Sequence, residues 1–360
     1  MPEEAITHAD AVCIGEAENN VPRIIEDFVA GRLKQFYKNE PVDLKGLAIP
    51  NRELIKKSAY IIPDALQATR GCPHRCKFCS ITAFFGNRFR VCPIDKVIEE
   101  LKTLGKNVLF LDDNIIGDRV YAEELFSKII HLKKRWFSQC SINIAYDAEL
   151  LRLAHVSGCR GIFIGLESLS QENLKSWNKG FNRSRDYIWA INKIHAAGIA
   201  VYGGIVFGMD WDTSDIFKKT LDFLYTAKVD ALQATILTPF PGTPLFEEMD
   251  SQGRIIDKDW SKYDFNHVVF EPKNISRDIL KNGHDRVLSE FYSRKSILRR
   301  LWHAFGYLSP WMVFRGLVPL NSGYRSRLEA DGTFERGKNL VVSRYTGGRY
   351  FFSSQTESAN

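Results

Sequence analysis

Short apolar runs alternate with amphipathic stretches between residues 63 and 275. Six runs rich in β-branched and other apolar residues are predicted to be strands: 65–69, 108–112, 141–147, 161–168, 200–210 and 231–240. Between them, apolar residues recur every three to four positions, which predicts helices, most clearly at 121–135, 186–198 and 214–228. Gly158 and Gly198 precede predicted strands, at positions where a glycine commonly ends a helix. The alternation indicates parallel strands joined by helical crossovers.

The number of strand–helix units narrows the fold class. Six units over roughly 200 residues are too few for a closed eight-unit barrel. We therefore expect an α/β protein with an open, partial (β/α)6 barrel similar to a TIM barrel. Its active site is expected at the carboxyl ends of the strands.

The chain is expected to contain four regions. Residues 1–62 are polar and interrupted by prolines, with one amphipathic run at 21–33, and end in a linker. Residues 63–275 form the barrel. Residues 276–345 are basic and helical, without further strands, and 346–360 are a polar tail that we expect to be disordered.

Composition is typical of a globular protein, with 44% apolar and 26% charged residues. The first residues lack the basic start and apolar core of a secretory signal. The seven cysteines are an odd number and cluster in one place, which favours a reducing, cytoplasmic location and a metal or redox role over disulfides. The net charge of +6 is modest for this length, so a nucleic acid partner is not expected.

Three of the cysteines, Cys72, Cys76 and Cys79, have the spacing C-x3-C-x2-C directly after the first predicted strand. Three thiolates on one loop can ligate three irons of a [4Fe–4S] cluster and leave the fourth iron open. An electron-transfer ferredoxin needs four cysteines, and structural zinc takes two separated pairs. We expect His74 to be an exposed loop residue rather than a zinc ligand. The alternative is a non-catalytic or electron-transfer iron–sulfur protein in which Cys92 is the fourth ligand, although Cys92 is better placed to begin the next helix.

The motifs TRGCPHRCKFCSITAFFGNRFR, FLDDNI, GLES, NKGFN, GIVFGMD and TPFPGTPLFEEM occur in this order. Together they resemble the radical S-adenosylmethionine (radical SAM) superfamily, in the subgroup with an N-terminal cobalamin-binding domain, over roughly residues 1–300. In that family the open iron chelates S-adenosylmethionine, and one electron from the reduced cluster cleaves it to methionine and a 5′-deoxyadenosyl radical. The resemblance implies that Cys72, Cys76 and Cys79 are the cluster ligands and that Phe78 flanks the adenine.

The resemblance also implies cofactor contacts at the second strand and fourth strand. Asp112, Asp113 and Asn114 stand where many relatives have a Gly-Gly-Glu run that accepts hydrogen bonds from the ammonium of S-adenosylmethionine. The alternative is that one of them only caps the following helix. Glu167 and Ser168 are implied to face the ribose or the methionine end, with loop capping as the alternative.

Further positions carry an implied or suggested role near the same site. Gly204, Val206 and Gly208 resemble the family's adenine-contact strand, although this run also suits barrel core. The turn at 239–244 either shapes the substrate side of the cavity or is simple turn chemistry. Arg88 and Arg90 either neutralise negative charge at the site or are solvated.

The first 40 residues resemble only the last portion of a cobalamin-binding domain, without its Asp-x-His-x-x-Gly loop. We therefore expect this chain, as an apparently truncated member, to bind cobalamin poorly or not at all. The resemblance implies a small-molecule substrate, lipid-like in some relatives, and an unactivated C–H bond as the target of methylation or oxidoreduction. It also implies a reducing partner such as flavodoxin or ferredoxin.

The segment 293–327 combines Lys and Arg with Trp, Phe, Tyr and Met and contains no Asp or Glu. It is too short and too interrupted by Pro310 and arginines to span a membrane. One interpretation is that its aromatics pack under the barrel while its arginines face water. The other is reversible peripheral contact with an anionic membrane.

Overall fold

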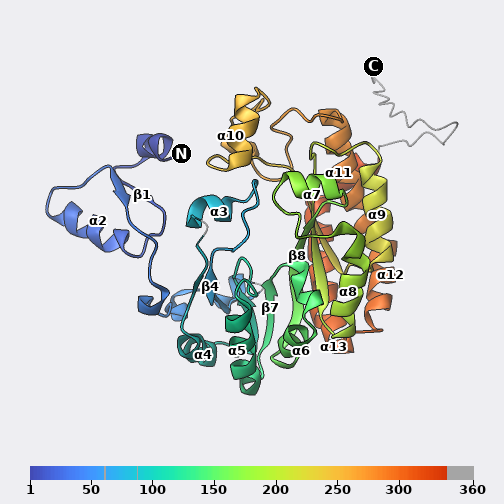
Figure 1. The fold of residues 1–360 in the computed structure, drawn as a ribbon, viewed down its shortest axis with the longest axis horizontal. Helices are drawn as coiled ribbons and strands as arrows, with labels where there is room; N and C mark the ends of the chain where they lie inside the picture. Colours follow the sequence, from blue (N-terminus) through green and yellow to red (C-terminus); the bar gives the residue numbers. More distant parts are fainter. Residues whose placement is uncertain (61, 87, 339–360) are drawn as a thin grey trace. The chain divides into compact units, whose positions relative to one another are not determined.

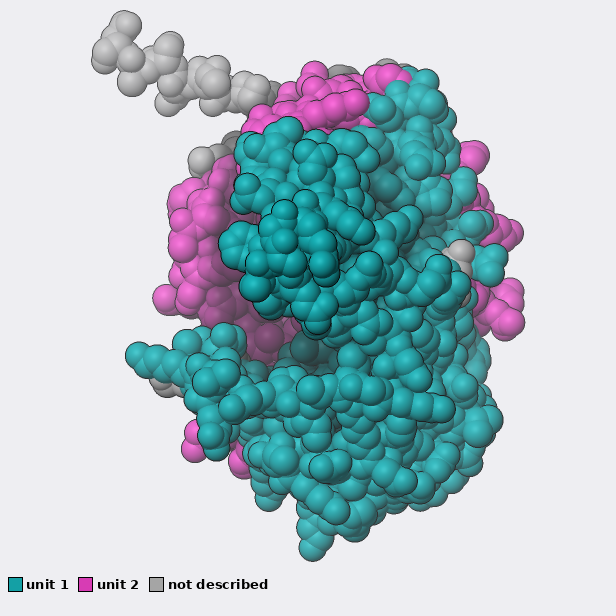
Figure 2. All heavy atoms as spheres, turned by 90° about the vertical axis from the view of Figure 1, so that its left-hand side faces the viewer, with its two compact units in different colours: residues 1–159, 177–179, 239–252 teal, residues 160–176, 180–238, 253–360 magenta. Residues whose placement is uncertain are grey.

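A computed structural model describes residues 1–60, 62–86 and 88–338 of the chain (Figure 1). The described chain forms two compact units (Figure 2). Unit 1 comprises residues 1–159, 177–179 and 239–252, and unit 2 comprises 160–176, 180–238 and the chain from 253 onward. The expected tail at 346–360 and the end of the C-terminal extension lie outside the described residues.

The largest sheet within the described residues has six parallel strands in the order β10-β9-β8-β7-β6-β3. The strands are β3 (Ala65–Leu66), β6 (Asn107–Phe110), β7 (Arg135–Gln139), β8 (Cys159–Glu167), β9 (Ala200–Phe207) and β10 (Ala231–Ile236). The order follows the sequence, as crossover connections between neighbouring parallel strands require. The predicted α/β fold class with a six-strand partial barrel is confirmed.

One predicted strand is wrong. The third strand is β7 (Arg135–Gln139), whereas the predicted strand at 141–147 is mostly a 3-10 helix, Ile142–Tyr146. The preceding helix ends at Ile129, and Lys133 then adopts a left-handed conformation (φ 50°) without a glycine to signal it. Ile142 and Ile144 are both buried by the 3-10 turn, so their spacing imitates the alternation of a strand.

Unit 1 contains the strands β3, β6 and β7 and the helices that cover them. Its helices are α1 (Pro2–Ala5), α2 (Asn20–Val29), α3 (Ser80–Phe85), α4 (Ile94–Thr103), α5 (Arg119–Ile129), α6 (Ala148–Val156) and α10 (Pro244–Ser251). Figure 1 shows α4, α5 and α6 next to one another along these strands. A separate parallel pair is formed by β1 (Val12–Ile14) and β2 (Phe36–Lys38), and α2 connects these two strands in the sequence. The antiparallel pair β4 (Thr69–Arg70) and β5 (Arg90–Val91) frames the cysteine loop.

Unit 2 contains β9, β10, nearly all of β8 and the helical C-terminal extension. Its helices are α7 (Gln171–Ser176), α8 (Tyr187–Ala196), α9 (Ile216–Thr226), α11 (Arg277–Phe291), α12 (Arg294–Ala304), α13 (Pro310–Met312), α14 (Val318–Ala330) and α15 (Thr333–Lys338), with a π-helical turn at Val313–Leu317. Helix α11 packs against β10, α9 and α15. Just after α11, the hydroxyl of Tyr292 donates to the carbonyl of Leu232 (2.6 Å) and accepts from its amide (3.0 Å), which satisfies backbone groups on the edge strand β10.

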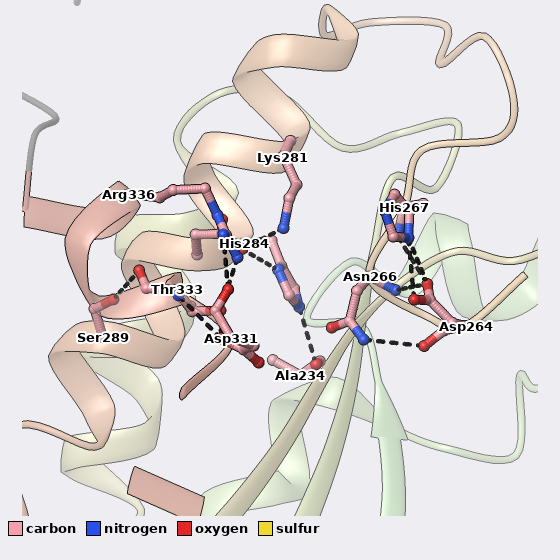
Figure 3. A network of polar contacts seen from close by, with 11 residues as sticks. Ala234, Asp264, Asn266, His267, Lys281, His284, Ser289, Asp331, Thr333 and Arg336 are labelled. Carbon is pink, nitrogen blue, oxygen red and sulfur yellow. Dashed lines mark hydrogen bonds and ion pairs between the residues drawn. The ribbon is translucent and has the colours of Figure 1, made fainter. Parts of the chain in front are cut away.

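A buried carboxylate fixes α15 to α11. Asp285 on α11 is 1% exposed, and its carboxylate accepts hydrogen bonds from Lys281 Nζ (2.7 Å) and Arg336 Nε (2.7 Å). His284 Nδ1 lies 3.0 Å from the same carboxylate, and its Nε2 lies 3.1 Å from the carbonyl of Ala234 on β10 (Figure 3). Burial alone would raise the pKa of Asp285, but the hydrogen bonds from these three side chains outweigh burial and hold the pKa well below its usual range. The network therefore joins α11, the helix α15 of the C-terminal extension and the edge strand β10.

Candidate active site

The cysteine loop lies in unit 1 between β4 and β5, directly after the first strand, as predicted. Cys76 is buried, Cys72 and Cys79 are half-buried, and none of the three forms a disulfide. The amide of Cys79 donates to the carbonyl of Cys76 (3.1 Å), and Cys79 is the residue before helix α3. The loop is therefore a compact turn followed at once by a helix, and all three thiols come from it.

Gly71, the residue before the first cysteine, is required by the path of the chain. Its φ is +87°, and a Cβ atom there would lie 2.1 Å from the carbonyl oxygen of Arg88. The amide of Gly71 donates to Asp113 Oδ2 (3.0 Å). Close approach of two backbone segments and a carboxylate from the second strand thus set where the cysteine loop begins.

Two distant segments of unit 1 hold the middle of the loop. The amide of Lys77 donates to the carbonyl of Trp177 (3.1 Å), and its carbonyl accepts from the amide of Leu245 (3.2 Å). Leu245 is in the first turn of α10, which Pro244 begins and Thr243 caps through its hydroxyl. The turn at 239–244 therefore has the turn chemistry that we considered, and in addition it positions the cysteine loop.

Phe78 is half-buried and packs against Trp177, with ring centroids 5.0 Å apart. The ammonium of Lys179 lies 5.7 Å from the centroid of the Phe78 ring, a distance that permits a cation–π interaction. Lys179 lies in the NKGFN stretch and Trp177 directly precedes it, about a hundred residues after Phe78 in the sequence. The sequence analysis identified neither Trp177 nor Lys179 as a site residue.

Charge and burial act against each other at the loop. Burial raises the pKa of the Cys72 thiol, and the Cys79 thiol adds to this, whereas the charge of Lys179 acts in the opposite direction. Burial and the charge of Lys179 lower the pKa of His74. His74 is half-buried, so the expectation of an exposed loop histidine is wrong. The reason is that α3 folds back on the loop, where the Thr82 hydroxyl donates to the His74 carbonyl (3.3 Å).

The side chains of Asp112, Asp113 and Asn114 brace the same region. Asp112 is 2% exposed and accepts hydrogen bonds from the Ala68 amide (3.2 Å) and the Thr69 hydroxyl (2.6 Å). Burial raises its pKa to about 7, against the effect of those hydrogen bonds. The capping alternative is wrong, because a later aspartate, Asp118, caps α5.

Asn114 connects the cysteine loop to the residues that follow the third strand. Its Nδ2 lies 3.9 Å from the sulfur of Cys72, and its Oδ1 accepts from the amide of Ser141 (3.1 Å). Asn114 is buried, and Asp113 is half-buried with its carboxylate on the Gly71 amide. Any contact between these three residues and a cofactor stays a prediction.

Glu167 and Ser168 belong to unit 2, at the carboxyl end of β8. Glu167 has a left-handed backbone (φ 64°) where the pairing with β9 is irregular, a conformation that costs a non-glycine residue about 1 kcal/mol and is common at functional sites. Ser168 is buried, and its hydroxyl accepts from the Ser170 amide (3.1 Å) and Asn173 Nδ2 (3.2 Å). Its contacts match the loop-capping alternative.

A buried Asn–Asp pair links the tips of β8 and β9 in unit 2. Asn173 Nδ2 donates to Asp212 (2.8 Å) as well as to Ser168, and Asp212 accepts from the amides of Gly208 (2.9 Å) and Met209 (3.0 Å). Burial raises the pKa of Asp212 to about 6. Neither Asn173 nor Asp212 was identified from the sequence, although Asp212 follows the GIVFGMD motif.

Side chains of unit 2 itself pack close to Gly204 in β9 and to Gly208, the residue after β9. A Cβ at Gly204 would lie 2.8 Å from the Phe163 ring, and one at Gly208 (φ +98°) would lie 2.8 Å from Leu280. Both contacts fit the core interpretation of this run. Val206 is half-buried, and an adenine contact there stays a prediction.

The remaining candidates of unit 1 have partners in its N-terminal segment. Arg90 is half-buried and donates to Glu16 (2.7 Å), so it is not a solvated arginine. Arg88 is exposed and donates to Glu40 (3.3 Å), which fits the solvated interpretation. A role of either arginine in neutralising charge at the site stays a prediction. Cys92 is buried, with its sulfur 3.9 Å from the Leu44 carbonyl, just before α4.

The comparisons agree with this geometry. The family model of the radical SAM superfamily matches residues 66–224. The bacteriochlorophyllide d C-12(1)-methyltransferase of Chlorobaculum tepidum is 35% identical over 315 residues, which cover 84% of this chain and 68% of that protein. The chain belongs to the radical SAM superfamily.

Two further proteins are similar to this chain, one in sequence and one in fold. The bacteriochlorophyllide d C-8(2)-methyltransferase of the same organism is 29% identical and matches 83% of this chain and 71% of its own length. The solved structure of OxsB, a cobalamin-dependent S-adenosylmethionine radical enzyme with aqua-cobalamin bound, has a TM-score of 0.60 at 16% identity. The match covers 91% of this chain and 58% of OxsB, and it shows the fold. The predicted family and its enzyme class are confirmed.

The radical SAM family uses a [4Fe–4S] cluster, and the donor set of the loop fits one. Among the described residues, no three His, Cys, Asp or Glu side chains are grouped around a point that a single metal ion could occupy. A cubane cluster binds each thiolate through a different iron, so its ligands need not converge on one point. Three thiols that form no disulfide, beside the charge of Lys179, suit such a cluster, and they do not form a zinc site.

Proposed function

We propose that this protein uses a [4Fe–4S] cluster on Cys72, Cys76 and Cys79 to cleave S-adenosylmethionine reductively and to act on an unactivated C–H bond. The observation that carries the proposal is the loop of three cysteines that form no disulfide, held at Gly71 and at both backbone groups of Lys77. When bound, the cluster supplies the electron and the open iron at which S-adenosylmethionine is cleaved.

The chain's own residues hold the cofactors and exclude water. Phe78, packed on Trp177, is proposed to cover the adenine, and Lys179 to offset negative charge at the loop. The backbone carbonyls of Asp112, Asp113 and Asn114, after the second strand, are proposed to accept hydrogen bonds from the ammonium of S-adenosylmethionine. The carboxylates of Asp112 and Asp113 are not proposed for this role, because they accept hydrogen bonds from the chain's own donors.

Unit 2 contains candidate cofactor contacts of its own. Glu167 is the candidate acceptor for the ribose hydroxyls, and its left-handed backbone at the end of β8 supports a functional role. Ser168, Gly204, Val206 and Gly208 are proposed to line the cofactor through backbone and apolar contacts. The Asn173–Asp212 pair would keep these two strand tips in register.

The substrate is proposed to be a hydrophobic small molecule, and the reaction its methylation or an oxidoreduction. Two relatives that match most of the chain are methyltransferases named for bacteriochlorophyllide d, a small-molecule substrate. We propose a cytoplasmic location and a reducing partner of the flavodoxin or ferredoxin type, since the reaction consumes an electron. Cobalamin binding by this chain is proposed to be weak, because the cobalt-ligating loop is missing from residues 1–62.

Metal analysis combined with EPR tests the proposal. Anaerobically reconstituted protein is expected to hold about four irons and four sulfides per chain, and its reduced EPR signal should shift when S-adenosylmethionine is added. Joint replacement of Cys72, Cys76 and Cys79 by Ala should abolish both. The matched control is Cys140→Ala, a buried free cysteine outside the loop, which should keep the cluster. Bound zinc without sulfide would contradict the proposal.

The electron-transfer alternative depends on Cys92. Its sulfur lies 3.9 Å from the Leu44 carbonyl, and Cys92 stands just before α4, outside the cysteine loop. Cys92→Ser should therefore leave the iron content unchanged. Loss of the cluster in this variant would favour the alternative.

A further inference from the structure

A cluster of large apolar side chains lies exposed on the C-terminal extension of unit 2. We call it the aromatic patch, and its members are Leu298, Trp302, Phe305, Trp311 and Phe314. Trp302 is 77% exposed and Phe314 63%. Single exposed apolar residues are ordinary on protein surfaces, but a contiguous group usually marks an interaction site.

The members of the aromatic patch form one surface. Leu298, Trp302 and Phe305 are spaced i, i+4 and i+7, so they share one face of α12 and its C-terminal turn. The rings of Phe305 and Phe314 lie 5.7 Å apart, which joins this face to the π-helical turn after α13. Trp311 precedes Phe314 by three residues, on the same short helical segment.

The opposite face of the extension is fixed to the body of unit 2. Ala304, Leu308, Val313 and Leu317 form a buried apolar cluster with Ala200 at the start of β9. The buried cluster is therefore the inner face of the extension, and the exposed aromatic patch lies on its solvent side. Figure 1 shows α12 and α13 within unit 2.

Polar contacts reinforce that inner face. Arg300, 4% exposed, donates to the carbonyls of Asp230 (3.1 Å) and Phe291 (2.8 Å). The hydroxyl of Tyr307 donates to the Asp230 carboxylate (2.5 Å). The interpretation that the aromatics of this segment pack under the barrel holds for Tyr307 and is wrong for the exposed Trp302 and Phe314. Its second part, that the arginines face water, is wrong for the buried Arg300.

Basic side chains surround the aromatic patch. Arg294, Lys295 and Arg299 are exposed on α12, and Arg315 is exposed directly after Phe314. Residues 293–327 contain no Asp or Glu. A carboxylate partner for these four side chains is not found among the described residues, in contrast to the exposed Lys and Arg of α5 and α9.

We propose that the aromatic patch and its basic border dock reversibly on an anionic membrane surface. Trp and Phe insert at the level of the lipid headgroups, and each nearby Lys or Arg strengthens attraction to anionic lipid. Within the part of the chain that the structure describes, no helix has the length and apolar character needed to cross a bilayer, so the contact is peripheral. Positive charge around apolar groups, without a carboxylate partner among the described residues, distinguishes this surface from an interface with a second copy, which would place like charges together.

Vesicle co-sedimentation of the full chain tests the proposal. The probes are phosphatidylcholine vesicles and vesicles of phosphatidylcholine and phosphatidylglycerol in a 3:1 ratio. The protein should bind the anionic vesicles at least about tenfold more strongly, and added salt should weaken that binding.

Two variant pairs separate the contributions of apolar groups and charge. Trp302→Ser with Phe314→Ser should reduce binding to anionic vesicles by at least about tenfold, whereas Trp189→Ser with Trp211→Ser, exposed tryptophans outside the patch, should not. Lys295→Glu with Arg315→Glu should reduce it by at least about tenfold, since each charge contributes about fivefold, and Lys102→Glu with Lys193→Glu should have a smaller effect.

Equal binding to both vesicle types would overturn the proposal, as would retention of binding in both patch variants. Binding to neither vesicle type, together with concentration-dependent dimers that the patch variants abolish in light scattering, would assign the surface to a second copy instead. These outcomes are independent of the cluster chemistry, because the assay uses no reductant and no S-adenosylmethionine.

Discussion

The substitution Gly71→Ala adds one methyl group, and we expect it to disturb the cysteine loop more than the same substitution at other glycines near the loop. The positive φ of +87° costs an L-residue about 1–2 kcal/mol. In addition, the new Cβ would lie 2.1 Å from the Arg88 carbonyl oxygen, so one backbone segment must move by roughly an ångström, at a typical overpacking cost of about 1–3 kcal/mol. We expect the free energy of unfolding to fall by about 2–5 kcal/mol.

Urea denaturation of the cluster-free protein measures this loss, and iron analysis after reconstitution measures its effect on the loop. The matched control is Gly15→Ala, which has the same φ of +87° but no atom within 4 Å of the new Cβ. The control should lose only about 1–2 kcal/mol and keep its iron, whereas Gly71→Ala should also lose iron because Cys72 moves with residue 71. Equal losses in the two variants would refute the close approach to Arg88.

Three further changes have definite expected outcomes. Burial raises the pKa of Asp112 to about 7, so between about pH 4 and pH 7 the folded protein holds a proton there that the unfolded chain does not. The free energy of unfolding of the wild type should therefore fall, relative to that of Asp112→Asn, as the pH rises from about 4 to about 7. Parallel pH profiles of the two proteins in urea melts would contradict this. Asp285→Asn should lower the free energy of unfolding by about 1.5–3 kcal/mol at pH 7, because the buried carboxylate loses its charge-assisted hydrogen bonds from Lys281 and Arg336. Since the pKa of Asp285 is depressed, the difference should shrink as the pH falls below about 4, and a pH-independent difference in thermal melts would argue against the network. Protein purified with hydroxocobalamin should show little or no bound cobalamin in its optical spectrum; a stoichiometric base-off spectrum would show that residues 1–62 bind it.

Local patterns predicted most of the fold. The alternation of apolar runs and amphipathic stretches identifies five of the six strands of the main sheet. The predicted stops at Gly158 and Gly198 coincide with positive φ angles. The third strand was misplaced because the helix before it ends at Ile129 and the chain then turns at Lys133, a residue type that carries no signal for a left-handed turn. Ile142 and Ile144 then supplied a false alternation.

The candidate site was predictable only in its local part. The spacing of the three cysteines is a property of eight consecutive residues, and the sequence is enough to find it. The supports of the loop are tertiary: Trp177 and Leu245 meet Lys77 from segments about a hundred and about 170 residues away. Similarly, the sequence shows that Asp112 and Asp113 follow a strand, but only the fold shows that their carboxylates accept from Thr69 and Gly71.

The release of 5′-deoxyadenosine tests the central claim most directly. Protein reconstituted anaerobically with iron and sulfide, reduced with dithionite and supplied with S-adenosylmethionine should release 5′-deoxyadenosine even without substrate. The release should require the reductant and should be absent from the variant with Ala at Cys72, Cys76 and Cys79. Protein that carries its cluster but neither binds S-adenosylmethionine nor releases 5′-deoxyadenosine would contradict the proposed function.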